Sequence, residues 1–108
     1  MTQEKLKSII ENAVKEREID LENADREDYM KILRDAESGD DTVLFDLIAD
    51  ADGHPIRIQA FTDVKYKEKT YSIILNFDLE LYGGIDELTE IILGEYKRAY
   101  DLQKNFTY

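Results

Sequence analysis

The sequence predicts an α+β fold, a three-stranded antiparallel β-meander packed against two N-terminal helices and one long C-terminal helix. Two patterns carry this prediction. Residues 71–82 largely alternate apolar and polar side chains, as a strand with one buried face does. Residues 85–106 repeat an apolar side chain every three or four positions, as an amphipathic helix does. We expect residues 1–108 to form a single compact domain.

The N-terminal region predicts a helix followed by a short extended piece. Residues 3–17 carry apolar side chains on one helical stripe, and Thr2 is suited to cap the start of that helix. Residues 18–22 then alternate strictly between acidic and apolar side chains. This alternation predicts an extended piece that turns Ile19 and Leu21 inward.

A second helix is expected next, with Asn23 or Asp25 as its N-cap. Ser38-Gly39 is predicted to end it, because glycine adopts the left-handed conformation common after a helix. Four side chains at helical spacing form its inner face: Tyr29, Ile32, Leu33 and Ala36.

Three strands are expected in the middle of the chain. Residues 42–49 fit either a strand or a helix, and their β-branched and aromatic side chains favour the strand. Asp52-Gly53 is a hairpin signal, Pro55 can open the second strand, and residues 67–69 form a polar turn before the third strand. The inner face of that third strand is expected to carry Tyr71, Ile73, Leu75, Phe77, Leu79 and Leu81.

The C-terminal helix is predicted to begin after Gly83-Gly84, with Asp86 and Glu87 in its first turn. Gly94 lies within this helix at a cost of about 1 kcal/mol relative to alanine, which suggests close packing at that position. The inner stripe is expected to comprise Ile85, Leu88, Ile92, Tyr96, Ala99, Leu102 and Phe106.

Charge is the strongest functional signal in the sequence. The chain has 25 acidic and 14 basic residues, a net charge of −11, and residues 16–28 hold seven acids against Arg17 and Arg26. Such a field attracts basic surfaces and repels nucleic acid and anionic membranes. The predicted partner-binding residues are Glu16, Glu18, Asp20, Glu22, Asp25, Glu27 and Asp28, together with Asp78, Glu80 and Tyr82 on the outer face of the third strand.

Motifs for catalysis or cofactors are missing from the sequence. There is no cysteine for a thiolate zinc site and no glycine-rich phosphate loop, and His54 is the single histidine. Asp50 to Gly53 resembles the middle of a calcium-binding loop, but Ile48 and Gln59 stand where that loop needs acids. We therefore expect no catalytic residue, no cofactor and no metal, and we interpret the chain as a soluble cytoplasmic protein that binds neither nucleic acid directly nor membrane.

The leading functional hypothesis is a non-enzymatic, acidic protein-binding module. Its partner would be a basic protein surface, most simply that of a nucleic-acid-handling protein, where carboxylates take the place of phosphates. In size, charge and α+β make-up the chain resembles the small acidic inhibitors that phages carry against restriction and CRISPR nucleases. The alternative is a small adaptor or structural protein, able to form a homodimer, whose acidity serves solubility.

Overall fold

The computed structural model describes residues 2–37, 42–78 and 84–105. In chain order, the elements are α1 (Gln3–Glu16), α2 (Arg26–Glu37), β1 (Val43–Ala49), β2 (Pro55–Tyr66), β3 (Lys69–Asp78) and α3 (Gly84–Asn105). The α+β prediction is confirmed, and residues 43–49 of the ambiguous segment form a strand. Several positions named above lie outside the described residues: Ser38, Gly39, Leu79, Glu80, Leu81, Tyr82, Gly83 and Phe106.

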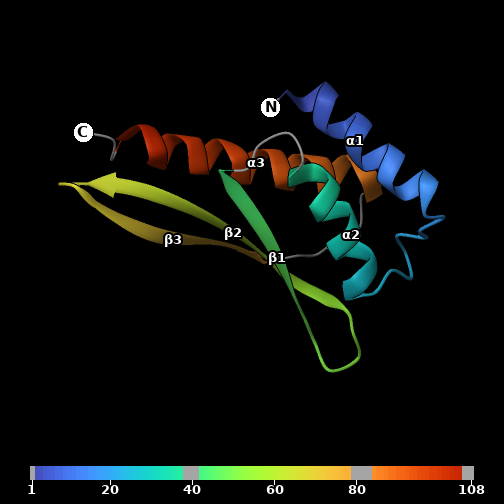
Figure 1. The fold of residues 1–108 in the computed structure, drawn as a ribbon. Helices are drawn as coiled ribbons and strands as arrows, with labels where there is room; N and C mark the ends of the chain where they lie inside the picture. The colour runs from blue at the N-terminus through green and yellow to red at the C-terminus, as the bar shows by residue number, and fades with distance from the viewer. Residues whose placement is uncertain (1, 38–41, 79–83, 106–108) are drawn as a thin grey trace.

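The three strands form an antiparallel sheet in the order β1-β2-β3. All three helices lie on one side of this sheet, and its other face carries no helix among the described residues (Figure 1). On the sheet, α3 packs chiefly over β2 and α2 packs against β1, and α1 packs on α2 and α3. The molecule is therefore a sheet covered on one face, with α1 as an outer layer.

Both N-terminal helices begin at a side chain that caps the backbone. The Thr2 hydroxyl accepts the N–H of Lys5 at 3.2 Å, as predicted. At the start of α2, the Asp25 carboxylate accepts the N–H of Asp28 at 2.9 Å, and the Asp28 carboxylate accepts the N–H of Asp25 at 3.3 Å. This reciprocal capping box selects Asp25 over Asn23 as the N-cap.

The predicted extended piece at residues 18–22 is wrong, because α1 ends in a Schellman motif that reverses the chain. The N–H of Ile19 bonds to the carbonyl of Val14 at 3.0 Å, and Glu18 adopts a φ of 52°. The residues that follow form turns. Ile19 and Leu21 nevertheless pack against the core, as the alternation predicted.

Tyr96 lies at the centre of the core. Its side chain is fully buried, and its hydroxyl donates a hydrogen bond to the carbonyl of Ala36 at 2.6 Å. Its ring meets the ring of Phe45 edge-on, with 5.1 Å between centroids. Through these contacts α3 holds the end of α2 and the middle of β1 together. The other fully buried large apolar side chains are Leu6, Ile10, Ile32, Leu33, Val43, Leu47, Ile58, Leu88 and Ile92.

The inner face of β3 is less covered than the sequence predicts. Tyr71 and Phe77 pair across the ladder with Val64 and Ile58, so they face the helix side of the sheet. Nevertheless, Tyr71 is 48% exposed and Phe77 is 39% exposed. The reason is the position of α3, which lies over β2 and leaves most of β3 uncovered.

The two hairpins connect through different loops. Between β1 and β2 the chain uses five residues, 50–54, which contain the predicted hairpin signal Asp52-Gly53, and the register shifts at Ile48 and Ala49. Between β2 and β3, Lys67 and Glu68 form a two-residue turn with φ values of 49° and 67°. Positive φ at both central residues is typical of the turn that matches sheet twist.

The half-buried position of β3 yields a prediction about core substitutions. Ile92 is fully buried, whereas Leu75 of β3 is half-buried. Ile92→Ala should lower the free energy of unfolding by about 2–5 kcal/mol, and Leu75→Ala by about 1–2 kcal/mol. Chemical denaturation of the two variants measures the difference. Equal losses would contradict the placement of α3 over β2.

A second prediction concerns Gly94, where close packing is not found. A Cβ added at Gly94 meets no atom within 4 Å. Gly94→Ala should therefore raise the free energy of unfolding by about 0.5–1 kcal/mol, because alanine loses less backbone entropy in a helix. The measurement is the denaturation midpoint, and a loss of stability would show that this position needs glycine after all.

Candidate functional site

The acidic segment, residues 16–28, lies at the end of the molecule where α1 passes into α2 (Figure 1). Glu16 is the last residue of α1. Glu18, Asp20 and Glu22 follow in the connection, and Asp25, Glu27 and Asp28 lie at the cap and in the first turn of α2. Six of these side chains are exposed and Asp28 is half-buried. All seven acids thus lie in one continuous stretch of chain at this end of the molecule, and six of them are exposed.

The two arginines of the segment point to acids elsewhere in the chain. Arg17 forms two hydrogen bonds with the carboxylate of Asp35, at 2.7 and 3.2 Å, which raise the pKa of the Arg17 guanidinium. Arg26 pairs with Asp46 at 2.9 Å. Within the part of the chain that the structure describes, no cation lies at ion-pair distance from the segment's seven acids. None of these seven carboxylates therefore has an ion-pair partner among the described residues.

Three of the seven acids also hold the backbone in place. Asp25 and Asp28 form the capping box of α2. Asp20 accepts the N–H of Glu22 at 3.1 Å and the side-chain amide of Asn23 at 2.7 Å. The carboxylates of the remaining four, which we call the free glutamates, accept no hydrogen bond from any described residue: Glu16, Glu18, Glu22 and Glu27.

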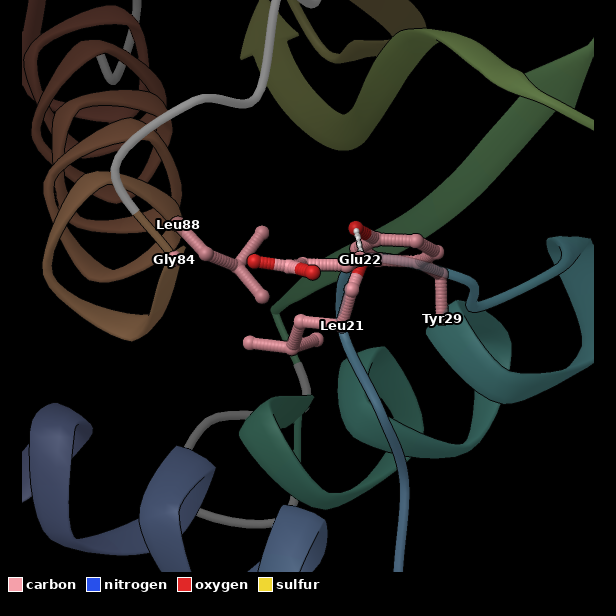
Figure 2. Close-up of a pocket in the computed structure, with 5 residues that line it drawn as sticks. All are labelled: Leu21, Glu22, Tyr29, Gly84 and Leu88. Carbon is pink, nitrogen blue, oxygen red and sulfur yellow. Dashed lines mark hydrogen bonds between the residues drawn. The ribbon is translucent and has the colours of Figure 1, made fainter.

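A small cavity lies beneath this surface, between the segment, α2 and the start of α3 (Figure 2). Its volume is about 50 Å³, and its lining residues are Leu21, Glu22, Tyr29, Gly84 and Leu88. The Tyr29 hydroxyl donates to the carbonyl of Leu21 at 3.3 Å, and burial raises the pKa of Tyr29. Such a volume holds one or two water molecules, whereas small-molecule pockets span about 300–1,000 Å³.

The other predicted partner-binding residues are Asp78, Glu80 and Tyr82, and the one that the structure describes, Asp78, is not part of the acidic segment. Asp78 lies on the open face of the sheet, where its carboxylate accepts the Nε–H of Arg57 at 2.8 Å. Its charge is therefore locally compensated. Glu80 and Tyr82 lie outside the described residues. Of the predicted site residues, those in the acidic segment are the ones that the structure brings together.

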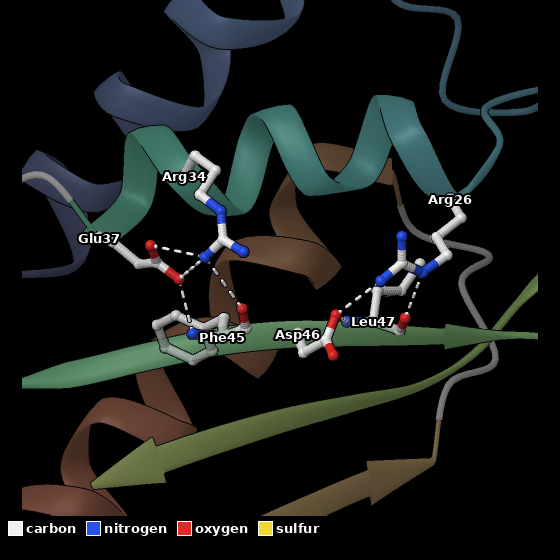
Figure 3. A network of polar contacts seen from close by, with 6 residues as sticks. All are labelled: Arg26, Arg34, Glu37, Phe45, Asp46 and Leu47. Carbon is white, nitrogen blue, oxygen red and sulfur yellow. Dashed lines mark hydrogen bonds and ion pairs between the residues drawn. The ribbon is translucent and has the colours of Figure 1, made fainter.

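The side chains of α2 cover the outer edge of β1 (Figure 3). Glu37 accepts the N–H of Phe45 at 2.6 Å, and Arg34 donates to the carbonyl of Phe45 at 3.3 Å. Arg26 donates to the carbonyl of Leu47 at 2.9 Å. Unpaired strand edges are templates for pairing with other chains, so these bonds close this edge.

The loop between β1 and β2 brings Asp50, Asp52 and His54 together, with one ligand atom from each within 4.8 Å of the others. The Asp50 carboxylate already accepts two backbone N–H groups, from Asp52 and His54, each at 2.9 Å. The bond from His54 lowers the pKa of Asp50. These contacts explain the cluster as the structure of an exposed loop.

Sequence reasoning missed one acid, Glu95 of α3. Its side chain is 1% exposed, one carboxylate oxygen accepts a hydrogen bond from Arg98 at 2.7 Å, and the other has no hydrogen-bond partner among the described residues. It lines a shallow groove of about 360 Å³ together with Phe77 and Gly94. Ile91 and Ala99 lie one helical turn before and after Glu95, and these apolar neighbours were the signal in the sequence that Glu95 lies on a buried face.

No protein-family model, curated protein or solved structure matches this chain. Among the described residues, no helix is long and apolar enough to cross a membrane.

The capping role of Asp25 separates it from the free glutamates in a stability measurement. Asp25→Ala should lower the free energy of unfolding by about 1 kcal/mol, because the N–H of Asp28 loses its acceptor. Glu27→Ala should cost less than about 1 kcal/mol, since it loses only the favourable charge at the helix start. Urea denaturation of both variants tests this order, and a larger loss for Glu27→Ala would refute it.

Proposed function

We propose that this protein is a non-enzymatic binding module whose acidic segment docks on a basic surface of another protein. The observation that carries the proposal is the diversion of Arg17 and Arg26. Each pairs with an acid outside the segment, at 2.7 and 2.9 Å. A chain that needed only solubility has no reason to leave seven neighbouring acids without an ion-pair partner, since their mutual repulsion lowers stability.

The free glutamates are the residues that meet the partner. They are exposed, and no intramolecular hydrogen bond to a described residue must break before they bind a cation. Exposed charges of this kind chiefly raise the association rate and make it sensitive to salt. Asp20, Asp25 and Asp28 contribute their charge while holding the turns and the start of α2 in shape.

The partner we favour is a cytoplasmic nucleic-acid-handling protein. Its binding groove is built to neutralise a row of phosphates, and a rigid surface with several carboxylates presents a comparable field. The resemblance to small acidic phage inhibitors of nucleases implies the same class of partner. Inhibition would follow from occupancy of that groove, with no chemistry required of this chain.

The test compares two variants of equal net charge. In the first, the free glutamates become glutamine: Glu16→Gln, Glu18→Gln, Glu22→Gln and Glu27→Gln. In the matched control, four exposed acids elsewhere lose their charge: Glu4→Gln, Glu68→Gln, Glu90→Gln and Asp101→Asn. The probe is a labelled nona-arginine peptide, and its fluorescence anisotropy is measured at low and moderate salt.

Removing the free glutamates should weaken peptide binding about tenfold at low salt, which corresponds to about 0.35 kcal/mol for each exposed charge. The control variant should lose less, because its net charge is the same and only the positions differ. The native protein should also displace a DNA duplex from the peptide more effectively than the first variant. Equal losses in both variants would show that net charge alone acts, and the solubility alternative would replace this proposal.

A further inference from the structure

The two edges of the sheet differ in how they are covered. At β1, side chains of α2 bond to the outward backbone groups of Phe45 and Leu47. Phe45 pairs with Ala60 and Ala60 with Leu75. Because Phe45 directs its backbone groups away from β2, Ala60 must direct its own toward Leu75, so Ile74 and Asn76 direct theirs outward. Among the described residues, nothing bonds to these outward groups of β3.

The uncovered edge also carries large apolar side chains. Ile74 is 51% exposed on the open face of the sheet, and Tyr71 and Phe77 are exposed on the helix side. Ile74 stands in one cross-strand row with Phe61 and Leu44. β3 is therefore an edge that is apolar on both faces and carries unpaired backbone groups, which is the arrangement that pairs with another strand.

Charge indicates what kind of strand fits there. Residues 55–78, which span β2 and β3, hold three acids and four bases, a net charge of +1. The rest of the chain carries −12. β3 itself holds one base and one acid, Lys69 and Asp78. Two copies of this acidic protein therefore repel each other least when they meet at β3.

We propose that β3 pairs antiparallel with β3 of a second copy, with the two-fold axis at Ile74. In this register Tyr71 faces Phe77 of the other copy, and Ile73 faces Leu75. Aromatic and branched cross-strand pairs of this kind stabilise sheets. Within the described strand, registers centred on Ser72 or Asn76 pair only two of these four apolar side chains with each other, whereas the Ile74 register pairs all four.

The same register suits the open face. Ile74 faces Ile74 of the second copy. The apolar row of Leu44, Phe61 and Ile74 therefore continues into the same row of the second copy. Further along, Thr70 faces Asp78 of the second copy. Lys65 is the cross-strand neighbour of Thr70, so its positive charge approaches the Asp78 carboxylate of the second copy. The sheet becomes six-stranded with all helices on one side, and α3 leaves room because it packs chiefly on β2.

The first experiment compares Ile74→Lys with Leu44→Lys. The two side chains lie on the same face of the sheet and are 51% and 50% exposed. Sedimentation velocity over a range of concentrations measures the dimer dissociation constant. Ile74→Lys places two like charges opposite each other on the axis and should raise this constant at least tenfold, whereas Leu44→Lys should change it less than threefold. Equal effects would overturn the proposal.

The second experiment uses the absence of cysteine from the sequence. Across a hydrogen-bonded antiparallel pair the two Cα atoms lie about 5.5 Å apart, within the range that a disulfide bridges. Oxidised Ile74→Cys should therefore run as a covalent dimer, and oxidised Leu44→Cys should remain monomeric. A native protein that stays monomeric up to about 100 μM, or equal cross-linking of the two variants, would refute pairing at β3.

Discussion

The hydrogen bond from Tyr96 to the carbonyl of Ala36 is the contact on which the remaining structure depends. It spans 60 residues of sequence and is fully buried. Together with the edge-on contact between Tyr96 and Phe45, it fixes α2 against β1 and beneath α3. A buried hydroxyl without an acceptor costs about 1–3 kcal/mol, so α2 cannot shift along β1 without losing this bond. The position of α2 then decides which backbone groups its side chains reach.

Arg26 connects the stability of the sheet to the charge of the surface. The position of α2 brings this guanidinium to Asp46 and to the carbonyl of Leu47, where it closes the edge of β1. The same bonds direct this cation away from the neighbouring acids, so one interaction both protects the sheet and leaves those acids without an ion-pair partner. The acidic segment lies on the β1 side of the molecule, and β3 is the opposite edge. Docking at one surface therefore leaves the other accessible.

The sequence alone determined the features that depend on near neighbours. The cap at Thr2, the inner face of α2, and the order of helices and strands follow from spacing along the chain, and each was found where it was predicted. The concentration of acids in residues 16–28 is equally a property of the sequence. Local periodicity fixes which side of an element is apolar, because it depends only on the repeat of the helix or strand.

Tertiary structure decided what covers each face and which charges pair. Tyr71 and Glu95 show both directions of this effect: the first lies on an apolar face and is 48% exposed, and the second is an acid of α3 that is almost fully buried. The partners of Arg17 and Arg26 stand 18 and 20 residues away, so no local pattern could identify them. Burial and ion pairing depend on the relative placement of whole elements, and that placement follows from packing in the core, which a pattern along one segment does not contain.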